Sequence, residues 1–233
     1  MGEKLATGNR LPDRVAASLR AAVSAIPFAG GALSEIISEV IPNQRMDRIE
    51  RFLIFLSEEM EAMRATNQYP RSEGPQLELL ETGLRSAAAT SATEKQNYLA
   101  KCVAKGLTKS DSEAIRAQRI ARIISELDPE EIVVLLSYTK SSISESQEFY
   151  KRYPEIFDVP TLLIGSNQGV RKQNAEYDAA KRHLIALGLL SEEIQFDRET
   201  GTARRFGFEV DKDIDITLVG RLVLFHAGLV AEF

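Results

Sequence analysis

The sequence predicts a mainly α-helical protein, in which an N-terminal helical bundle is followed by a smaller α+β module that carries a two-stranded β-hairpin. Apolar residues recur at helical spacing through most of the chain, whereas strand-like alternation is confined to a short region near residues 193–210. The chain has 233 residues and a hydrophobic content of 44%, which suffices for one large domain or two small ones. We therefore expect a flexible N-terminus over residues 1–11, the bundle over 12–128 and the α+β module over 129–233.

Composition narrows the class of protein further. The net charge of −5 gives no global attraction to nucleic acid or to anionic lipid, although a local basic patch could still bind either. The N-terminus lacks the apolar core of a secretory signal, and a single cysteine fits a reducing compartment. These features predict a cytoplasmic protein.

The first element is a helix from about Pro12 to Ser24, which leads into a segment of small residues over 21–42 that carries no charge until Glu35. Three helix-interrupting residues divide this segment into a tight helical hairpin: Pro27, Gly30 and Gly31. Two interpretations compete, a hairpin buried in the bundle and a segment that inserts into membrane. A membrane-spanning helix needs about 20 apolar residues, and Arg20 and Glu35 enclose a shorter run. The buried hairpin is therefore favoured, and a membrane partner is not expected.

The second element is a helix over about 44–66 with one apolar stripe. Its members are Met46, Ile49, Phe52, Leu53, Leu56, Met60 and Met63. Ile54 and Phe55 widen the apolar face beyond this stripe. This width predicts a helix at the centre of the bundle or in an oligomer interface, with Phe52, Phe55 and the glycine hairpin as candidate contacts.

Three further helices are predicted to complete the bundle, over about 76–88, 91–106 and 111–127. The second of them places Cys102 on the same face as Leu99 and Val103, which indicates a core cysteine rather than a nucleophile.

The third of these helices carries a basic ridge of three arginines at every third residue: Arg116, Arg119 and Arg122. One interpretation is a contact with phosphates or with an acidic partner. The other is a solvated face balanced by Glu113 and Glu126 through near-neighbour ion pairs, which is the more common situation on exposed helices.

The C-terminal module begins at a clear helix start. In Asp128-Pro129-Glu130-Glu131, an acidic N-cap precedes proline at the first helical position and a glutamate at the third. Helices over about 129–140 and 143–153 follow, and then a helix in AEYDAAKRHLIALGLL whose inward residues are Tyr177, Ala180, Leu184 and Leu187.

The remaining elements are a hairpin and a last helix. EIQF and RRFGFEV alternate polar and apolar residues on either side of DRETGTA, and Thr217 caps the final helix. Over about residues 129–229 this order of helices, ribbon and helix resembles a winged-helix domain.

A DNA-binding winged helix needs positive charge on its recognition helix and wing. The candidate contacts are Lys181, Arg182, Arg204 and Arg205. Residues 171–210 nevertheless contain seven basic and seven acidic side chains, so this region has no net charge. Winged helices also serve as protein–protein modules, and DNA binding is therefore an alternative rather than the first expectation.

The sequence shows no constellation typical of an enzyme. His183 and His226 have no metal-binding spacing, and Cys102 has no nearby histidine in the sequence. We expect no enzymatic activity, no cofactor and no metal site.

One resemblance adds to these inferences. The segments AIPFAGGALSEIISEVIPNQRMDRIERFLIFL, TEKQNYLAKCVAKGL and ELDPEEIVVLLSY resemble a group of uncharacterised bacterial helical proteins, some of which resemble abortive-infection (phage-defence) proteins. The resemblance covers roughly the first 140 residues and transfers no functional residue. It implies a bacterial protein and a possible role in phage defence.

Together these observations predict a non-enzymatic interaction or effector protein that acts through self-association or through a protein partner. Two alternatives remain open. One is a winged-helix DNA-binding regulator, and the other is a membrane-perturbing effector that uses residues 21–42.

Overall fold

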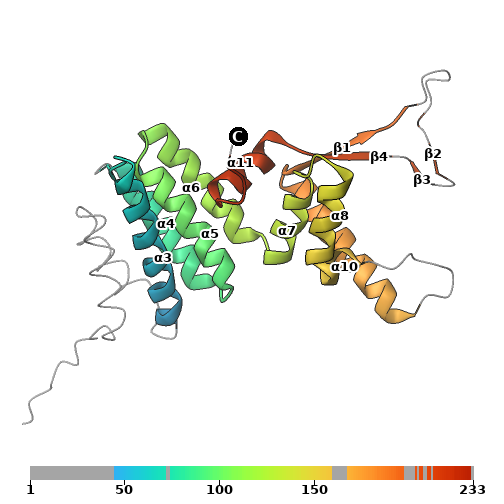
Figure 1. Cartoon of the computed structure of the whole chain (residues 1–233), viewed down its shortest axis with the longest axis horizontal. Coiled ribbons are helices and arrows are strands. Elements are labelled where there is room, and N and C mark those ends of the chain that lie inside the picture. The colour runs from blue at the N-terminus through green and yellow to red at the C-terminus, as the bar shows by residue number, and fades with distance from the viewer. Residues whose placement is uncertain are drawn as a thin grey trace, which may run out of the picture. The chain divides into compact units, whose positions relative to one another are not determined.

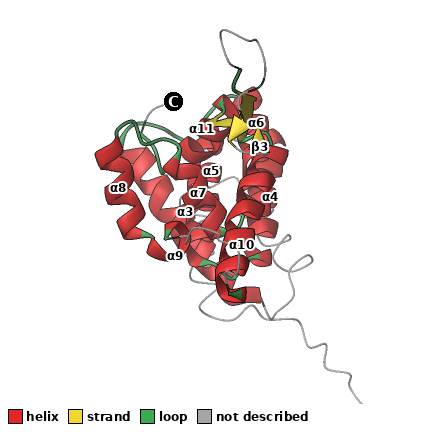
Figure 2. Cartoon of the chain, turned by 90° about the vertical axis from the view of Figure 1, so that its right-hand side faces the viewer, coloured by secondary structure: helices red, strands yellow, loops and turns green. Residues whose placement is uncertain are grey.

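The structure is a computed structural model of the chain that describes residues 45–71, 74–158, 167–196, 203, 205–206, 209–210 and 212–231. Helix accounts for 73% of these residues, and a small two-stranded antiparallel sheet lies near the C-terminus (Figure 2). The predicted mainly α-helical class with a β-hairpin is confirmed. The predicted hairpin over 21–42, with Pro27, Gly30 and Gly31, lies outside the described residues.

The chain forms two compact units. The N-terminal unit contains Met1–Glu126 together with the short segment His226–Gly228, and the C-terminal unit contains Leu127–Phe225 and Leu229–Phe233. Each unit has its own buried residues and is treated separately below. None of the described helices has the length and the apolar character that a membrane crossing requires.

Four described helices make up the N-terminal unit: α3 (Met46–Ala65), α4 (Gly74–Ala89), α5 (Thr93–Leu107) and α6 (Asp111–Glu126). Helix α5 packs against the other three, and α4 packs against α3 and α6 (Figure 1). All four helices occur where the apolar periodicity predicts them, because each must bury one apolar stripe against its neighbours.

The core of this unit allows a close approach of helices at Gly83. A Cβ added to Gly83 would lie 2.5 Å from Val103 Cγ2 on α5 and 3.1 Å from Phe52 Cζ on α3. The position therefore requires glycine, because a larger residue would displace both side chains. Phe52 has no exposed surface, in keeping with its place between these helices.

The C-terminal unit contains five helices among its described residues: α7 (Pro129–Ser137), α8 (Ile143–Arg152), α9 (Pro154–Phe157), α10 (Gln168–Ala186) and α11 (Leu218–His226). Its strands are β1 (Leu190–Ile194), β2 (Arg205–Phe206), β3 (Glu209–Val210) and β4 (Lys212–Ile216). Helix α10 packs against α7 and β1, and the ribbon formed by β1 and β4 extends beyond the helices of this unit (Figure 1). The order of three packed helices, ribbon and final helix is that of a winged-helix-like module.

The start of α7 has the predicted capping box. The Asp128 side chain accepts from the backbone of Glu131, and the backbone N–H of Asp128 donates to Glu131 Oε2 at 2.8 Å. Proline occupies the first helical position, where its missing donor is not needed. A sequence of four residues therefore determines where this helix begins.

The pairing of the ribbon differs from the predicted hairpin. The main ladder joins β1 to β4 in antiparallel register, from Leu190 opposite Ile216 to Ile194 opposite Lys212. The segment expected to form one strand over 204–210 instead contains β2 and β3, which pair with each other. Phe196, at the end of the first predicted strand, forms a bridge with Ala203, a residue of the predicted connection DRETGTA.

The end of the ribbon is tied to the end of α10 through Thr217. The hydroxyl of Thr217 donates to the carbonyl of Gly188 at 2.7 Å and accepts from the backbone N–H of Gly220 at 3.0 Å. Thr217 is thus the N-cap that the sequence predicts for α11. The same hydroxyl fixes α11 relative to the start of β1.

Candidate interaction surfaces

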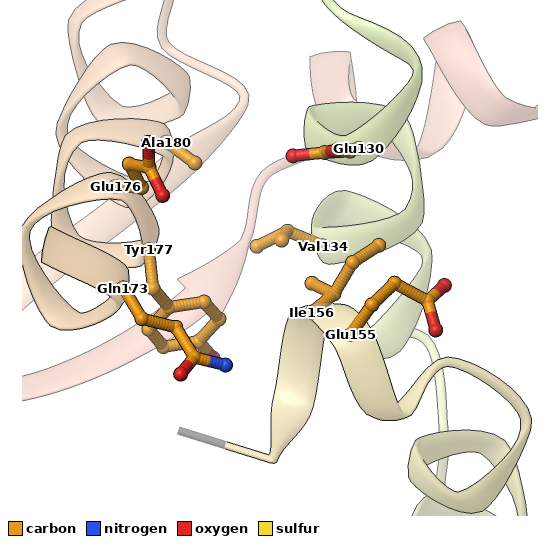
Figure 3. A pocket seen from close by; sticks show the side chains of 8 residues that line it. All are labelled: Glu130, Val134, Glu155, Ile156, Gln173, Glu176, Tyr177 and Ala180. Atoms are coloured by element: carbon orange, nitrogen blue, oxygen red, sulfur yellow. The ribbon is translucent and has the colours of Figure 1, made fainter. Parts of the chain in front are cut away.

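A small hollow lies between α7, α9 and α10 of the C-terminal unit (Figure 3). Its apolar lining consists of Val134, Ile156, Tyr177 and Ala180, and its polar lining of Glu130, Glu155, Gln173 and Glu176. The hollow holds about 60 Å³, whereas pockets for small organic ligands hold roughly 300–1,000 Å³. This space suits the tip of one side chain rather than a metabolite.

The aromatic ring that lines the hollow, Tyr177, lies next to the cationic side chain of Lys181. Lys181 Nζ lies 4.7 Å from the centre of the Tyr177 ring and forms an ion pair with Asp178 at 3.0 Å. Burial raises the pKa of the Tyr177 hydroxyl, and the nearby Tyr150 and Asp178 raise it further. Lys181 is therefore already held by two partners on its own helix.

The structure does not assemble the four predicted nucleic-acid contacts into one described surface. Arg182 is exposed on α10, one residue after the engaged Lys181. Arg204 lies outside the described residues, and Arg205 is described only as part of the β2 backbone. The proposed basic surface at these positions stays a prediction.

The ribbon has two chemically different faces, because side chains alternate across a strand. One face runs from the buried Leu190 and the half-buried Ile216 at its base to Ile194 and Phe196 near its far end. Ile194 is 46% exposed and Phe196 is 58% exposed. This apolar face also carries a cross-strand ion pair between Lys212 and Glu192 at 2.9 Å.

The opposite face of the ribbon is acidic. Glu193 lies directly opposite Asp213, and Asp215 lies opposite Ser191. All three carboxylates are exposed. Sequence reasoning missed this acidic face, although alternation in Lys212-Asp-Ile-Asp-Ile216 was the available signal. For convenience, we call Glu193, Asp213 and Asp215 the acidic face.

On α6 the three arginines of the predicted basic ridge are all exposed, while the opposite side of the helix is buried against α4 and α5. None of Arg116, Arg119 and Arg122 forms an ion pair with Glu113 or Glu126, so the predicted near-neighbour pairs do not occur. We refer to these three arginines as the arginine ridge.

The Glu113 carboxylate is hydrogen-bonded to Ser110 rather than paired with an arginine of the ridge. It accepts from the Ser110 hydroxyl at 3.0 Å and from the Ser110 backbone N–H at 3.4 Å. These hydrogen bonds lower the pKa of Glu113, with smaller contributions from Lys109 and Arg116. Glu113 thus serves mainly to cap the start of α6.

The two aromatic residues predicted for an oligomer interface lie in different environments. Phe52 is fully buried in the core of the N-terminal unit, so it cannot contact a second molecule in the folded state. Phe55 is half-buried on the same helix, and the neighbouring Ile54 is 39% exposed. Of the two residues, Phe55 is the one that can contribute to an interface.

Cys102 belongs to the core, as predicted. Its thiol donates to the Ala117 carbonyl at 3.4 Å, and Sγ lies 3.9 Å from His226 Nδ1. Burial raises the pKa of the thiol to about 12, against a smaller opposing influence of Lys105. Burial also lowers the pKa of His226 to about 4. Near neutral pH both groups are uncharged, which is the opposite of the thiolate–imidazolium pair that a cysteine nucleophile requires.

His183 has a structural partner. Its Nδ1 lies 2.7 Å from Glu131 Oε1, while the other oxygen of this carboxylate belongs to the capping box of α7. The pair joins α10 to the start of α7. Among the described residues, no group of three or more His, Cys, Asp and Glu side chains is arranged to hold a metal ion.

Comparison with known protein families, with curated proteins and with solved structures finds no match to this chain.

Proposed function

We propose that the protein is a non-enzymatic interaction or effector protein whose C-terminal unit binds a protein partner or a second copy of the chain. The observation that carries this proposal is the apolar face of the ribbon, where Ile194 and Phe196 are exposed next to each other on one strand face.

The energetics of the ribbon favour a protein partner. Each apolar Å² removed from water stabilises a complex by roughly 25 cal/mol, so covering one isoleucine and one phenylalanine is a substantial gain. The ribbon consists of two paired strands, β1 and β4. Each has an outer edge to which an extended segment can add as a further strand. A partner could therefore combine apolar contacts with backbone hydrogen bonds.

The charge of the ribbon weighs against DNA as the partner. The acidic face would repel phosphates, and Lys181 is already bound to Asp178. Titration of labelled duplex DNA at low and at physiological salt tests this alternative directly. Binding that weakens with salt and is lost in Arg182→Glu would contradict the proposal of a protein partner.

The proposal is tested by co-purification of the full-length protein from its host, followed by quantitative mass spectrometry. The variant Ile194→Ser/Phe196→Ser should lose the proteins that copurify with wild type or lose its self-association. The matched control is Ile143→Ser/Tyr150→Ser, because these residues of α8 are 79% and 41% exposed. Equal recovery of partners and equal self-association in wild type and both variants would refute the proposal.

The phage-defence setting is suggested by the sequence resemblance alone. It predicts that expression of the wild-type protein lowers phage plaque formation and that the Ile194→Ser/Phe196→Ser variant does not. Unchanged plaque counts with the wild-type protein across a panel of phages would remove this setting and leave the interaction role in place.

A further inference from the structure

The charges on the acidic face of the ribbon are arranged unfavourably for an isolated hairpin. Like charges directly opposite each other on neighbouring strands destabilise the pair, and Glu193 and Asp213 are directly opposite. The ion pair that the structure shows within the ribbon, between Lys212 and Glu192, lies on the other face. The acidic face therefore has no compensating cation among the described residues of the ribbon.

The arginine ridge has the complementary property. Its three side chains are exposed on α6 and form no ion pair with the residues that the structure describes, and Glu113, the nearest acidic residue before them, is held by Ser110. Ile115, which is 42% exposed, lies beside them and adds an apolar contact area. Guanidinium groups bind carboxylates with two parallel hydrogen bonds, so carboxylates are well suited to this ridge.

The charges of the arginine ridge and of the acidic face are spaced over similar lengths. Arg116 and Arg122 are separated by about 9 Å along the helix axis, given a rise of about 1.5 Å per residue. Asp213 and Asp215 are separated by about 7 Å along the strand, and Glu193 lies across from the first of them. The three cations of the ridge and the three anions of the acidic face therefore have similar spacing.

We propose that the arginine ridge of one copy of the chain binds the acidic face of the ribbon of a second copy. This inference rests on the proposed function, because it names the partner of the ribbon. The contact joins two different surfaces, so each bound copy retains one free ridge and one free acidic face. Repetition of such a contact closes into a ring or continues as a filament.

The proposed contact is electrostatic, so it can be tested by raising the salt concentration and by reversing charges on either surface. Sedimentation velocity of the full chain should show an average mass that rises with protein concentration at low salt and falls toward the monomer in ~1 M salt. Arg119→Glu/Arg122→Glu should weaken self-association about a hundredfold, because like charges then face each other. Glu193→Lys/Asp213→Lys should do the same.

A chain that combines Arg119→Glu/Arg122→Glu with Glu193→Lys/Asp213→Lys has the same net charge as the wild type. Its two surfaces again carry opposite charges at the substituted positions. It should self-associate again, while failing to co-assemble with the wild type through these surfaces. The matched control is Lys151→Glu/Arg152→Glu, which makes the same charge change as the ridge variant on the exposed end of α8. This control should self-associate like the wild type. Circular dichroism verifies that each variant keeps its helical content.

Several results would overturn the inference. These are a wild type that stays monomeric, a doubly reversed chain that stays monomeric, and a control that dissociates as strongly as the ridge variant. Compaction of a monomer that depends on both surfaces would assign the contact to a single chain instead. Binding of duplex DNA that is lost in Arg119→Glu/Arg122→Glu would assign the ridge to phosphates. If self-association is absent but Ile194→Ser/Phe196→Ser still loses a copurifying protein, the proposed function survives and only this inference fails.

Discussion

The two units of the chain differ in how completely they bury their apolar residues. The largest fully buried side chains, from Phe52 to Leu99, all belong to the N-terminal unit. By contrast, six of the nine exposed large apolar residues that the structure shows belong to the C-terminal unit: Ile143, Tyr150, Ile194, Phe196, Leu218 and Val219.

This difference is the one that the proposed function predicts between a structural unit and a unit that binds a partner. Each of the four described helices of the N-terminal unit is long enough to bury a continuous apolar stripe against its neighbours. Apart from α10, the helices of the C-terminal unit are shorter, and Ile194 and Phe196 near the far end of its ribbon are exposed. Apolar surface that a folded unit leaves exposed to water is surface that a partner can cover.

The largest expected effect concerns the core of the N-terminal unit. Phe52→Ala should lower the free energy of unfolding by about 3–5 kcal/mol, because it leaves a cavity between α3, α4 and α5. Phe55→Ala on the same helix is the control and should cost less than half as much. Urea unfolding followed by circular dichroism measures both. Equal losses would show that the two residues are not distinguished by burial.

The second prediction tests the C-terminal unit in the same way. A Cβ at Gly220 would collide with the carbonyl oxygen of Leu189 and lie 2.9 Å from Ile216 Cγ1. Gly220→Ala should therefore destabilise this unit by about 1–3 kcal/mol, even though alanine favours helix. Hydrogen exchange should be faster in α11 and β1 of the variant. The control is Gly74→Ala, where a Cβ meets nothing within 4 Å; a similar effect at both sites would contradict the prediction.

The third prediction is that His226 contributes a pH-dependent stability to the N-terminal unit. Burial, assisted by the charges of Lys105 and Arg116 and opposed by Glu113, lowers the pKa of His226 from 6.5 to about 4. The unfolded chain therefore binds more protons between these pH values, so this stabilisation is complete above pH 6.5 and is lost as the pH falls toward 4.

At pH 5, His226 should cost the wild type about 2 kcal/mol of unfolding free energy relative to pH 7.5. Urea unfolding of wild type and His226→Gln at both pH values isolates this contribution, because other titrating groups affect both proteins. A difference between the two proteins that does not change with pH would show that His226 is not desolvated.

The smallest effect is expected at the start of α8. The Ser142 hydroxyl accepts from the backbone N–H of Glu145 at 3.2 Å, and Ser142→Ala should cost about 1 kcal/mol. Ser141→Ala removes a neighbouring exposed hydroxyl and should be nearly neutral. Thermal unfolding of the two variants would compare them directly, and equal melting temperatures would contradict a capping role for Ser142.

Local signals in the sequence predicted most of the helices. The apolar stripes located α3 to α6, the Asp128-Pro129 start located α7, and Thr217 located α11. Each of these depends on interactions within a few residues, which periodicity and capping rules describe.

The sequence was less informative about the ribbon and about which surfaces are exposed. Pairing between β1 and β4 joins residues more than 15 positions apart, which local sequence patterns do not report. In the predicted strand over 204–210, Gly207 is a residue type that often marks a turn or a bulge. The acidic face was missed because the charge balance was taken over residues 171–210, which excludes Asp213 and Asp215.

The short segment His226–Gly228 has a further consequence for how the protein can be dissected. The chain leaves the N-terminal unit after Glu126, returns to it at His226 and leaves it again after Gly228, so both units are discontinuous and residues 127–225 form an insertion in the N-terminal unit. Ala227 is 1% exposed, and a Cβ at Gly228 would lie 2.6 Å from Lys101 Cδ. A fragment that ends at residue 126 would therefore lack part of its own core and leave the Cys102 region uncovered. A faithful single-domain fragment would need the last segment rejoined through a short linker that replaces the insertion.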